Sequence, residues 1–274
     1  MSDGVLRLFS ALSGWVYTAA WSLSFYPQPL LNYGRKSTSG TTIDFPFLNS
    51  LGFLAYLISN CAFYFSPLIR AQYAHRNNGL TPTVQPNDIA FAAHALLLSL
   101  VTVTQYVPSV WGFHVSSTRP SRAILGIALG SVLAVALVAL RVSFAGGGSG
   151  PGGAADWCAL DVVYAVSYVK LVVTLVKFTP QVVANYRNKS TRGWSIWQIL
   201  LDVTGGVLSV AQQCADSYLQ RDWSGLTGNP VKLALGNVSM VYDSIFIWQH
   251  YVLYRGSSSR KTGEEEGLLG RRED

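Results

Sequence analysis

Several charged and amide side chains interrupt long apolar stretches of this sequence, where such groups are costly. A charged side chain at the centre of a bilayer costs about 2.5–3.5 kcal/mol on insertion scales, so those that remain usually have a function. A carboxylate in a dry site tends to keep its proton, whereas a nearby Lys favours the charged form. The pattern therefore predicts acids that exchange protons beside a polar cavity. The residues concerned are Asp88, Lys177, Asn185, Asp202, Lys232 and Asp243, with Asn49 nearby.

Two of these acids lie deep inside apolar segments, and two of the charges lie near segment ends. For Asp202 and Asp243, the alternative to proton exchange is a static buried ion pair that fixes the register of two helices. For Asp88 and Lys232, the alternatives are helix capping by the acid and snorkelling of the lysine.

A sixteen-residue segment occurs twice, at 25–40 and 178–193, with an offset of 153 (180 minus 27) and nine identical positions. Each copy places a Pro-Gln pair within an apolar helix, where proline removes a hydrogen bond and kinks the helix. Two matched kinks favour a hinge over a plain structural bend, and paired broken helices are typical of a substrate site between two halves. The predicted hinge residues are Pro27, Gln28, Pro180 and Gln181.

The same offset pairs Asp202 with Asn49 (202 minus 153). The two halves therefore differ by one titratable group at this position, as expected for an asymmetric carrier that is coupled to protons.

These residues need membrane-spanning helices to position them. Half of the 274 residues are hydrophobic, 12% are charged and the mean hydropathy is +0.28. Soluble domains carry roughly 25% charged residues, and a bilayer core needs about 20 apolar residues per helix. The predicted spans are 6–31, 42–65, 87–107, 122–144, 157–186, 195–219 and 230–254.

The repeat organises these spans into an all-α membrane protein with two parallel three-helix repeats joined by a linker helix, a 3+1+3 plan. The first repeat occupies 1–110, and the linker helix with a Gly-rich loop occupies 111–156. The second repeat occupies 157–255, and a disordered tail follows at 256–274.

The distribution of Lys and Arg predicts the orientation, because cytosolic loops are enriched in them. The loops after spans one, three and five, with the tail, hold twelve, and the other side holds five. We therefore expect a cytosolic C-terminus and a lumenal N-terminus whose first helix is retained. In the tail, Glu264, Leu268 and Leu269 have the form of an acidic di-leucine sorting signal, which suggests a lysosome or vacuole and an interaction with sorting adaptors.

Other classes of function lack their motifs. The three cysteines are far apart and form no CxxC, which argues against zinc or a disulfide framework. No hydrolase motif or metal-ligand spacing occurs, so no enzyme, metal or cofactor is predicted beyond protons as the coupling ion. The net charge of +6 follows from the loop bias, so the expected surroundings are membrane lipid rather than nucleic acid.

Taken together, the two Pro-Gln segments and the strings 189–196 and 200–206 resemble the PQ-loop family, and within it the lysosomal cystine exporters. The likeness spans residues 6–255. It implies a fold like that of sugar-exporting SWEETs and the co-transport of L-cystine and protons from an acidic lumen to the cytosol by alternating access. It also implies substrate contacts at Lys177, Asn185, Asp202 and Lys232, and proton coupling at Asp88, Asp202 and Asp243.

The chemistry of cystine agrees with this resemblance, because both ends of the molecule are zwitterionic. Asp202 and Asn185 could accept from its ammonium groups, and Lys177 and Lys232 could donate to its carboxylates. A cationic amino-acid or sugar carrier of the same family, or a seven-helix sorting receptor, is the alternative.

Overall fold

Helices account for the regular structure throughout the part of the chain that the computed structural model describes. This part comprises residues 3–77, 79, 81–82, 84, 86–115, 117–144, 157–220 and 230–255, without the side chains of 3, 87, 213, 216, 220 and 230–236. Within it there are no β-strands, and a single isolated bridge joins Ser37 to His114. The all-α prediction is confirmed.

The helices belong to two compact units, each built from separate stretches of the chain. The first unit comprises the described residues of Met1–Ile43, Thr104–Thr118 and Phe178–Asp274. Its elements are α1 (Asp3–Leu23), α2 (Pro27–Arg35), α6 (Pro108–Trp111), α9 (Thr179–Asn188), α10 (Ile196–Gln220), α12 (Pro230–Trp248) and the π-helical turn η1 (Gln249–Leu253).

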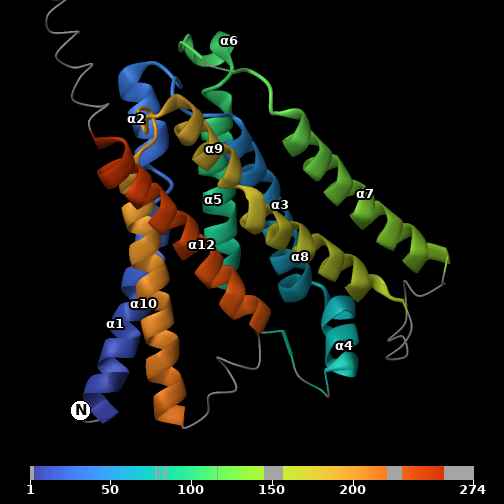
Figure 1. The fold of residues 1–274 in the computed structure, drawn as a ribbon. Coiled ribbons are helices and arrows are strands. Elements are labelled where there is room, and N and C mark those ends of the chain that lie inside the picture. The colour runs from blue at the N-terminus through green and yellow to red at the C-terminus, as the bar shows by residue number, and fades with distance from the viewer. Residues whose placement is uncertain are drawn as a thin grey trace, which may run out of the picture. The chain divides into compact units, whose positions relative to one another are not determined.

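The first unit is organised around α1 and α10, which run side by side over much of their length (Figure 1). A side chain at Gly205 of α10 would collide with the ring of Trp21 on α1, so glycine is what permits this close approach. Farther along, α12 packs on α10, and Trp194 stacks on Phe246 at 5.3 Å between ring centroids. The two copies of the repeated segment form α2 and α9, which lie toward the same end of the unit (Figure 1).

The second unit comprises Asp44–Val103 and Arg119–Lys177. Its core joins α3, α7 and α8 through Leu48, Ala55, Ile124, Val169 and Val173. Its elements are α3 (Asp44–Phe65), α4 (Pro67–Arg76), α5 (Pro86–Thr104, all but its last residue), α7 (Arg122–Phe144) and α8 (Ala159–Val176).

In the part of the chain that the structure describes, three helical segments are long and apolar enough to cross a bilayer: Asp44–Phe65, Arg122–Phe144 and Ala159–Asn188. Leu129, Leu133 and Leu137 on α7 lie four residues apart and are more than half exposed, which gives the helix an apolar outer stripe. Such a stripe suits contact with lipid. Helices also lie in the other four predicted ranges, and the full 3+1+3 plan stays a prediction.

The structure differs from the expected spans in three details. The first span is interrupted between α1 and α2 and the fifth between α8 and α9, so a new helix starts at Pro27 and at Thr179, next to Pro180, instead of a continuous helix that bends. This follows from the missing N–H of proline, which the first turn of a helix does not need. The short helix α4, which begins at Pro67 beside the N-cap Ser66, lies outside the expected spans.

Candidate functional site

The two Pro-Gln segments adopt the same local structure. Pro27 is the first residue of α2, and Pro180 is the second residue of α9. Both helices end at a left-handed lysine, Lys36 with φ 47° and Lys189 with φ 49°. This conformation is unusual for a residue with a side chain. Its recurrence at the same offset shows that the repeat extends from the sequence to the backbone.

The turns that follow meet each other in the first unit. Gly40 has φ 91° and Gly193 has φ 93°, in the region that favours glycine. A Cβ atom on Gly40 would overlap the carbonyl oxygen of Arg192, and one on Gly193 would overlap that of Ser39. The two copies therefore contact backbone to backbone, and a side chain on either glycine would separate them.

Gln28 joins its own helix to the turn of the other copy. Its Nε2 donates to Asn32 Oδ1 at 2.9 Å and to the carbonyl oxygen of Gly193 at 2.8 Å. Its Oε1 accepts from the backbone N–H of Ser195 at 2.7 Å. The side chain is 3% exposed, so water does not replace these partners.

Gln181 repeats this arrangement with the partners exchanged. Its Nε2 donates to Asn185 Oδ1 at 2.9 Å and to the carbonyl oxygen of Gly40 at 3.1 Å, and its Oε1 accepts from the N–H of Thr42 at 3.2 Å. Gly40 and Thr42 are the offset partners of Gly193 and Ser195 (40 plus 153 and 42 plus 153). Each Pro-Gln glutamine thus holds the turn of the other repeat.

A third buried amide completes each network. Asn32 Nδ2 donates to Gln105 Oε1 at 2.8 Å, and Gln105 Nε2 donates to the carbonyl oxygen of Pro29 at 3.0 Å. In the second copy, Asn185 Nδ2 donates to Gln249 Oε1 and Gln249 Nε2 donates to the carbonyl oxygen of Val182, both at 3.1 Å.

The two networks together are called the paired amide networks: Gln28, Asn32 and Gln105, and Gln181, Asn185 and Gln249. Sequence reasoning missed Gln105 and Gln249 because they differ by 144 residues (249 minus 105), not by 153. A glutamine at the end of the third apolar span of each half was the available signal. Asn185 is fully buried and both atoms of its amide are engaged, so in this conformation it contacts Gln181 and Gln249 rather than open space.

Asp202 lies on α10 in the first unit and is half-buried. Its Oδ2 accepts from Ser239 Oγ on α12 at 3.0 Å, and its backbone oxygen accepts from Trp21 Nε1 on α1 at 3.2 Å. Within the described part of the chain this carboxylate makes no ion pair. The described partner of this carboxylate is therefore a hydroxyl.

Asp243 is fully buried on α12, four residues after Ser239. Residues four apart lie on the same face of a helix. Asp243 is therefore placed one turn from Ser239, the residue of α12 that binds Asp202 of α10.

Lys177 ends the second unit, where its Nζ donates to Asn49 Oδ1 at 3.3 Å. Asn49 Nδ2 in turn donates to Ser99 Oγ at 2.9 Å. Lys170 lies seven residues earlier on α8, with Nζ 3.6 Å from the centroid of the Phe53 ring. The position equivalent to Asp202 is thus a neutral amide that accepts a hydrogen bond from an ammonium group.

The remaining predicted residues are placed as follows. Asp88 is half-buried in the first turn of α5, where an acid interacts favourably with the helix N-terminus. This placement agrees with the capping alternative. Lys232 lies on α12 but its side chain is outside the described residues, as are Glu264, Leu268 and Leu269 of the proposed sorting signal. Among the described residues no group of His, Cys, Asp and Glu could hold a metal ion.

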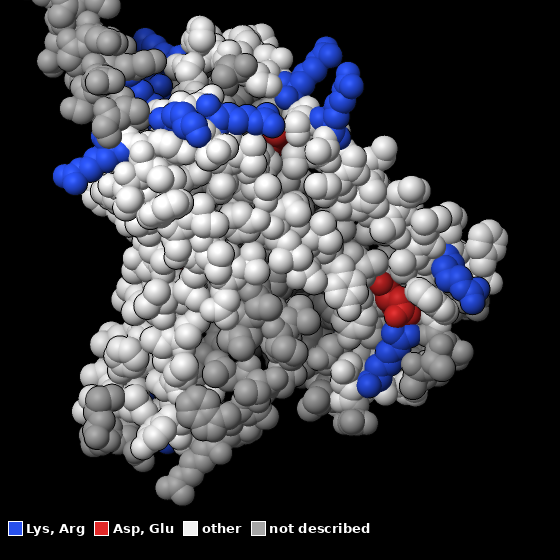
Figure 2. Space-filling model, in the orientation of Figure 1, with Lys and Arg blue, Asp and Glu red and all other residues white. Residues whose placement is uncertain are grey.

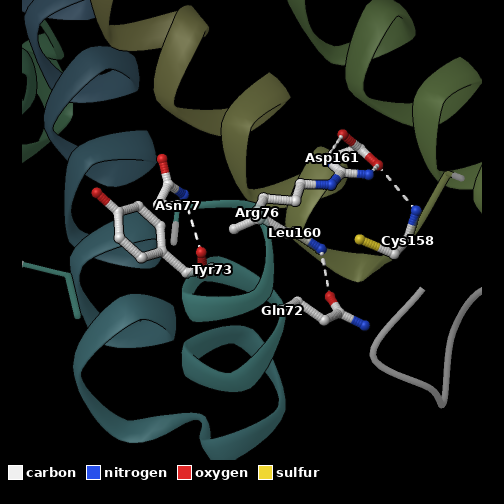
Figure 3. Close-up of polar contacts among 7 residues, drawn as sticks. All are labelled: Gln72, Tyr73, Arg76, Asn77, Cys158, Leu160 and Asp161. Atoms are coloured by element: carbon white, nitrogen blue, oxygen red, sulfur yellow. Dashed lines mark hydrogen bonds and ion pairs between the residues drawn. The ribbon is translucent and has the colours of Figure 1, made fainter. Parts of the chain in front are cut away.

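A polar cluster that sequence reasoning missed joins α4 to the start of α8 (Figure 3). Both guanidinium nitrogens of Arg76 donate to Asp161, with Nη2 2.9 Å from Oδ2, and Gln72 Oε1 accepts from the N–H of Leu160 at 2.9 Å. Asp161 also accepts from the N–H of Cys158, which caps α8. Its carboxylate raises the pKa of Arg76 above its ordinary value.

Basic side chains gather at the end of the first unit that carries the two turns (Figure 2). They belong to the last turns of α2 and α9, to the loops that follow these two helices, and to the segment just after η1. The residues are Arg35, Lys36, Arg187, Lys189, Arg192 and Arg255. This is the end predicted to face the cytosol.

Known proteins resemble this chain over most of its length. The family described as PQ loop repeat matches residues 9–69 and 162–222, one match in each half. The cystinosin homolog of Dictyostelium discoideum is 38% identical over 255 residues, which cover 93% of this chain and 84% of that protein.

Two further relatives differ in length and in similarity. Cystinosin of Drosophila melanogaster is 41% identical over 256 residues, and the match spans 93% of this chain but 61% of that protein. The cystine transporter of Saccharomyces cerevisiae is 28% identical over 248 residues, which cover 87% of this chain and 92% of that protein.

Proposed function

Because the chain belongs to the cystinosin family of PQ-loop repeat proteins, we propose that it exports cystine together with protons from an acidic lysosome or vacuole to the cytosol. The observation that carries the proposal is the state of Asp202. It is a half-buried acid on an apolar helix, held by a hydroxyl and by no cation within the described part of the chain. These described contacts favour an acid that exchanges a proton over one held in a static ion pair.

The proposed proton route joins Asp202 to Asp243. Ser239 donates a hydrogen bond to Asp202 and lies one turn from Asp243 on α12. Its hydroxyl would therefore lie between the two acids and could pass a proton from one to the other. A neutral acid is favoured in a dry helix interior, and a charged one where a cation or water is near. Loading from an acidic lumen and release to the cytosol would then accompany each cystine. Asp88 is a further proposed coupling residue.

The proposed substrate contacts follow from the two zwitterionic ends of cystine. Asp202 would accept from an ammonium group. Lys177 would donate to a carboxylate of cystine. Its ammonium group is hydrogen-bonded to the neutral amide of Asn49. Lys232 would donate to the other carboxylate. Asn185 would contact the substrate only once its bonds to Gln181 and Gln249 open.

The proposed alternating access uses the two helix breaks as hinges. One break separates α1 from α2 and the other separates α8 from α9, each beside a Pro-Gln pair. The second break coincides with the passage of the chain from one compact unit to the other, at Lys177–Phe178. The paired amide networks would hold the segments Pro27–Arg35 and Thr179–Asn188 as rigid pieces on either side of these hinges.

Counterflow of labelled cystine into proteoliposomes tests the proposal. Vesicles preloaded with unlabelled cystine should accumulate label, and excess lysine or glucose outside should not compete. An acidic exterior relative to the interior should increase net uptake. Inhibition by lysine would instead identify a carrier of cationic amino acids, and the absence of counterflow would contradict a carrier for cystine.

A further inference from the structure

A pocket of about 510 Å³ lies at the basic end of the first unit, beside η1. Tyr254 at its wall is buried, and Tyr251 is half exposed. Pockets that bind small molecules are typically about 300–1,000 Å³. None of the residues proposed for transport lines it. The described residues that line the pocket are Thr191, His250, Tyr251, Tyr254 and Arg255.

The pocket is shaped by the π-helical turn. Gln249 directs its amide to Asn185 and to the carbonyl oxygen of Val182, as part of the second amide network. The next residue, His250, lies with Nδ1 2.8 Å from Thr191 Oγ1, in the turn after α9. Single π-helical turns often occur at functional sites. Two walls of the pocket are therefore fixed to each other by side-chain hydrogen bonds.

The polar groups around the pocket are donors or cations. Arg255 supplies a guanidinium, His250 an imidazole, and Thr191 and the two tyrosines supply hydroxyls. The acids of this unit whose side chains the structure describes are Asp202 and Asp243, both on apolar helices. No described carboxylate lines the pocket. Its ligand is therefore expected to be an anion.

We propose that this pocket binds the phosphate group of a phosphorylated polyol, either as a lipid headgroup or as a soluble compound. A guanidinium recognises phosphate with two parallel hydrogen bonds. Thr191 Oγ1 and His250 Nδ1 are hydrogen-bonded to each other, so with a neutral imidazole the pair adds one donor to the same group, either the hydroxyl of Thr191 or Nε2–H of His250. The volume exceeds what one phosphate needs, and the rings of Tyr251 and Tyr254 offer flat faces to a ring that carries it. The carbonyl end of η1 disfavours an anion slightly, and a charge-assisted bond to Arg255 outweighs it.

Binding to the full chain in nanodiscs tests the proposal. One arm adds a soluble inositol bisphosphate or inorganic phosphate to phosphatidylcholine nanodiscs. The other arm compares nanodiscs that do and do not contain a phosphatidylinositol phosphate, using quenching of a headgroup-labelled lipid. Saturable binding in either arm supports the site and identifies the source of the phosphate.

Variants separate the pocket from general attraction to a basic surface. Arg255→Gln should weaken binding at least tenfold, and Thr191→Val, which keeps the charge, should weaken it severalfold. Arg122→Gln removes the same charge from the start of α7, outside the pocket, and should change nothing. Equal losses in Arg255→Gln and Arg122→Gln, full binding by Thr191→Val, or no saturable binding of any probe would overturn the site. The readout is independent of cystine transport, so its failure and that of the proposed function are distinguishable.

Discussion

The paired amide networks have the same hydrogen bonds in both repeats. By contrast, a second pair of positions related by the 153-residue offset carries Asp202 in one repeat and Asn49 in the other. In the first case, the same donor and acceptor atoms meet the same backbone groups at the 153-residue offset. In the second, a carboxylate accepts from a hydroxyl, and an amide accepts from an ammonium. The groups that shape the two helix breaks are kept in both copies, and the group that can titrate is present in one.

The match between the two turns is broken most severely by a side chain on either glycine. Gly40→Ala and Gly193→Ala each place a Cβ onto a backbone oxygen at a φ that disfavours it. We expect little folded protein from either variant, measured by size-exclusion chromatography of a fluorescent fusion. Gly34→Ala on α2 has no atom within 4 Å of its new Cβ and is the control. Normal folding of Gly40→Ala would show that the turns do not meet as described.

Removing one glutamine tests whether the two networks contribute equally. Gln28→Leu leaves Asn32 Oδ1, Gly193 O and Ser195 N without this partner, and Gln181→Leu does the same at the equivalent groups. Each unsatisfied buried group costs about 1–3 kcal/mol. Both variants should therefore lower the melting temperature by similar amounts in thermal scanning fluorimetry.

The control is Gln198→Leu on α10, a half-buried glutamine outside both networks, which should melt close to the parent. A large loss in one glutamine variant and none in its counterpart would contradict the equivalence of the two networks.

Making the unmatched positions alike sharpens the comparison. Asn49→Asp places a carboxylate where Lys177 now donates to a neutral amide. The lysine should then pair with it and become less available to a substrate carboxylate. We expect the KM for cystine to rise about tenfold, equivalent to about 1.4 kcal/mol, with folding retained. Asn49→Ser, which adds no charge, should have a smaller effect. An unchanged KM would argue that Lys177 does not bind substrate.

The smallest effect is expected at the ion pair of the second unit, which has no counterpart in the first that the structure describes. Arg76 and Asp161 are 19% and 20% exposed, so solvent screens them partly and Arg76→Gln should cost about 1 kcal/mol. The pKa of Arg76 is raised, so its contribution is present below the ordinary value and is lost only at higher pH.

The stability loss caused by Arg76→Gln should therefore be the same at about pH 7 and about pH 9. Arg70→Gln, also on α4 and exposed, is the control and should be close to neutral. A loss that shrinks over this range would contradict the assignment.

The sequence was sufficient to predict helices in the seven apolar ranges and the positions of the repeat, because these follow from hydrophobic length and a fixed offset, but not the short helix α4. It could not show that Gln28 and Gln181 each hold the other copy, since that requires knowing that the two turns meet. It missed Gln105 and Gln249 because their spacing departs from the offset. It also took the prolines as kinks, although the helices stop and restart beside them.

The polar site was predicted in part. Lys177 and Asn49 are brought together, and Asp202 of α10 contacts Ser239 of α12, one turn before Asp243. The partner of Asp202 is Ser239, a common residue type that no pattern distinguished. Asn185 was predicted as a substrate contact, but in the structure its amide oxygen accepts from Gln181 and its amide nitrogen donates to Gln249. Burial of this kind depends on packing between distant segments.

The measurement that tests the account most directly is proton movement during cystine transport. Proteoliposomes containing a pH-sensitive dye are supplied with cystine, and labelled cystine exchange is followed in parallel. The parent chain should acidify the vesicle interior as cystine enters. Asp202→Asn, which makes this position like Asn49, should exchange labelled cystine while moving no protons. Proton movement by Asp202→Asn at the parent rate would contradict the claim that the unmatched acid carries the proton.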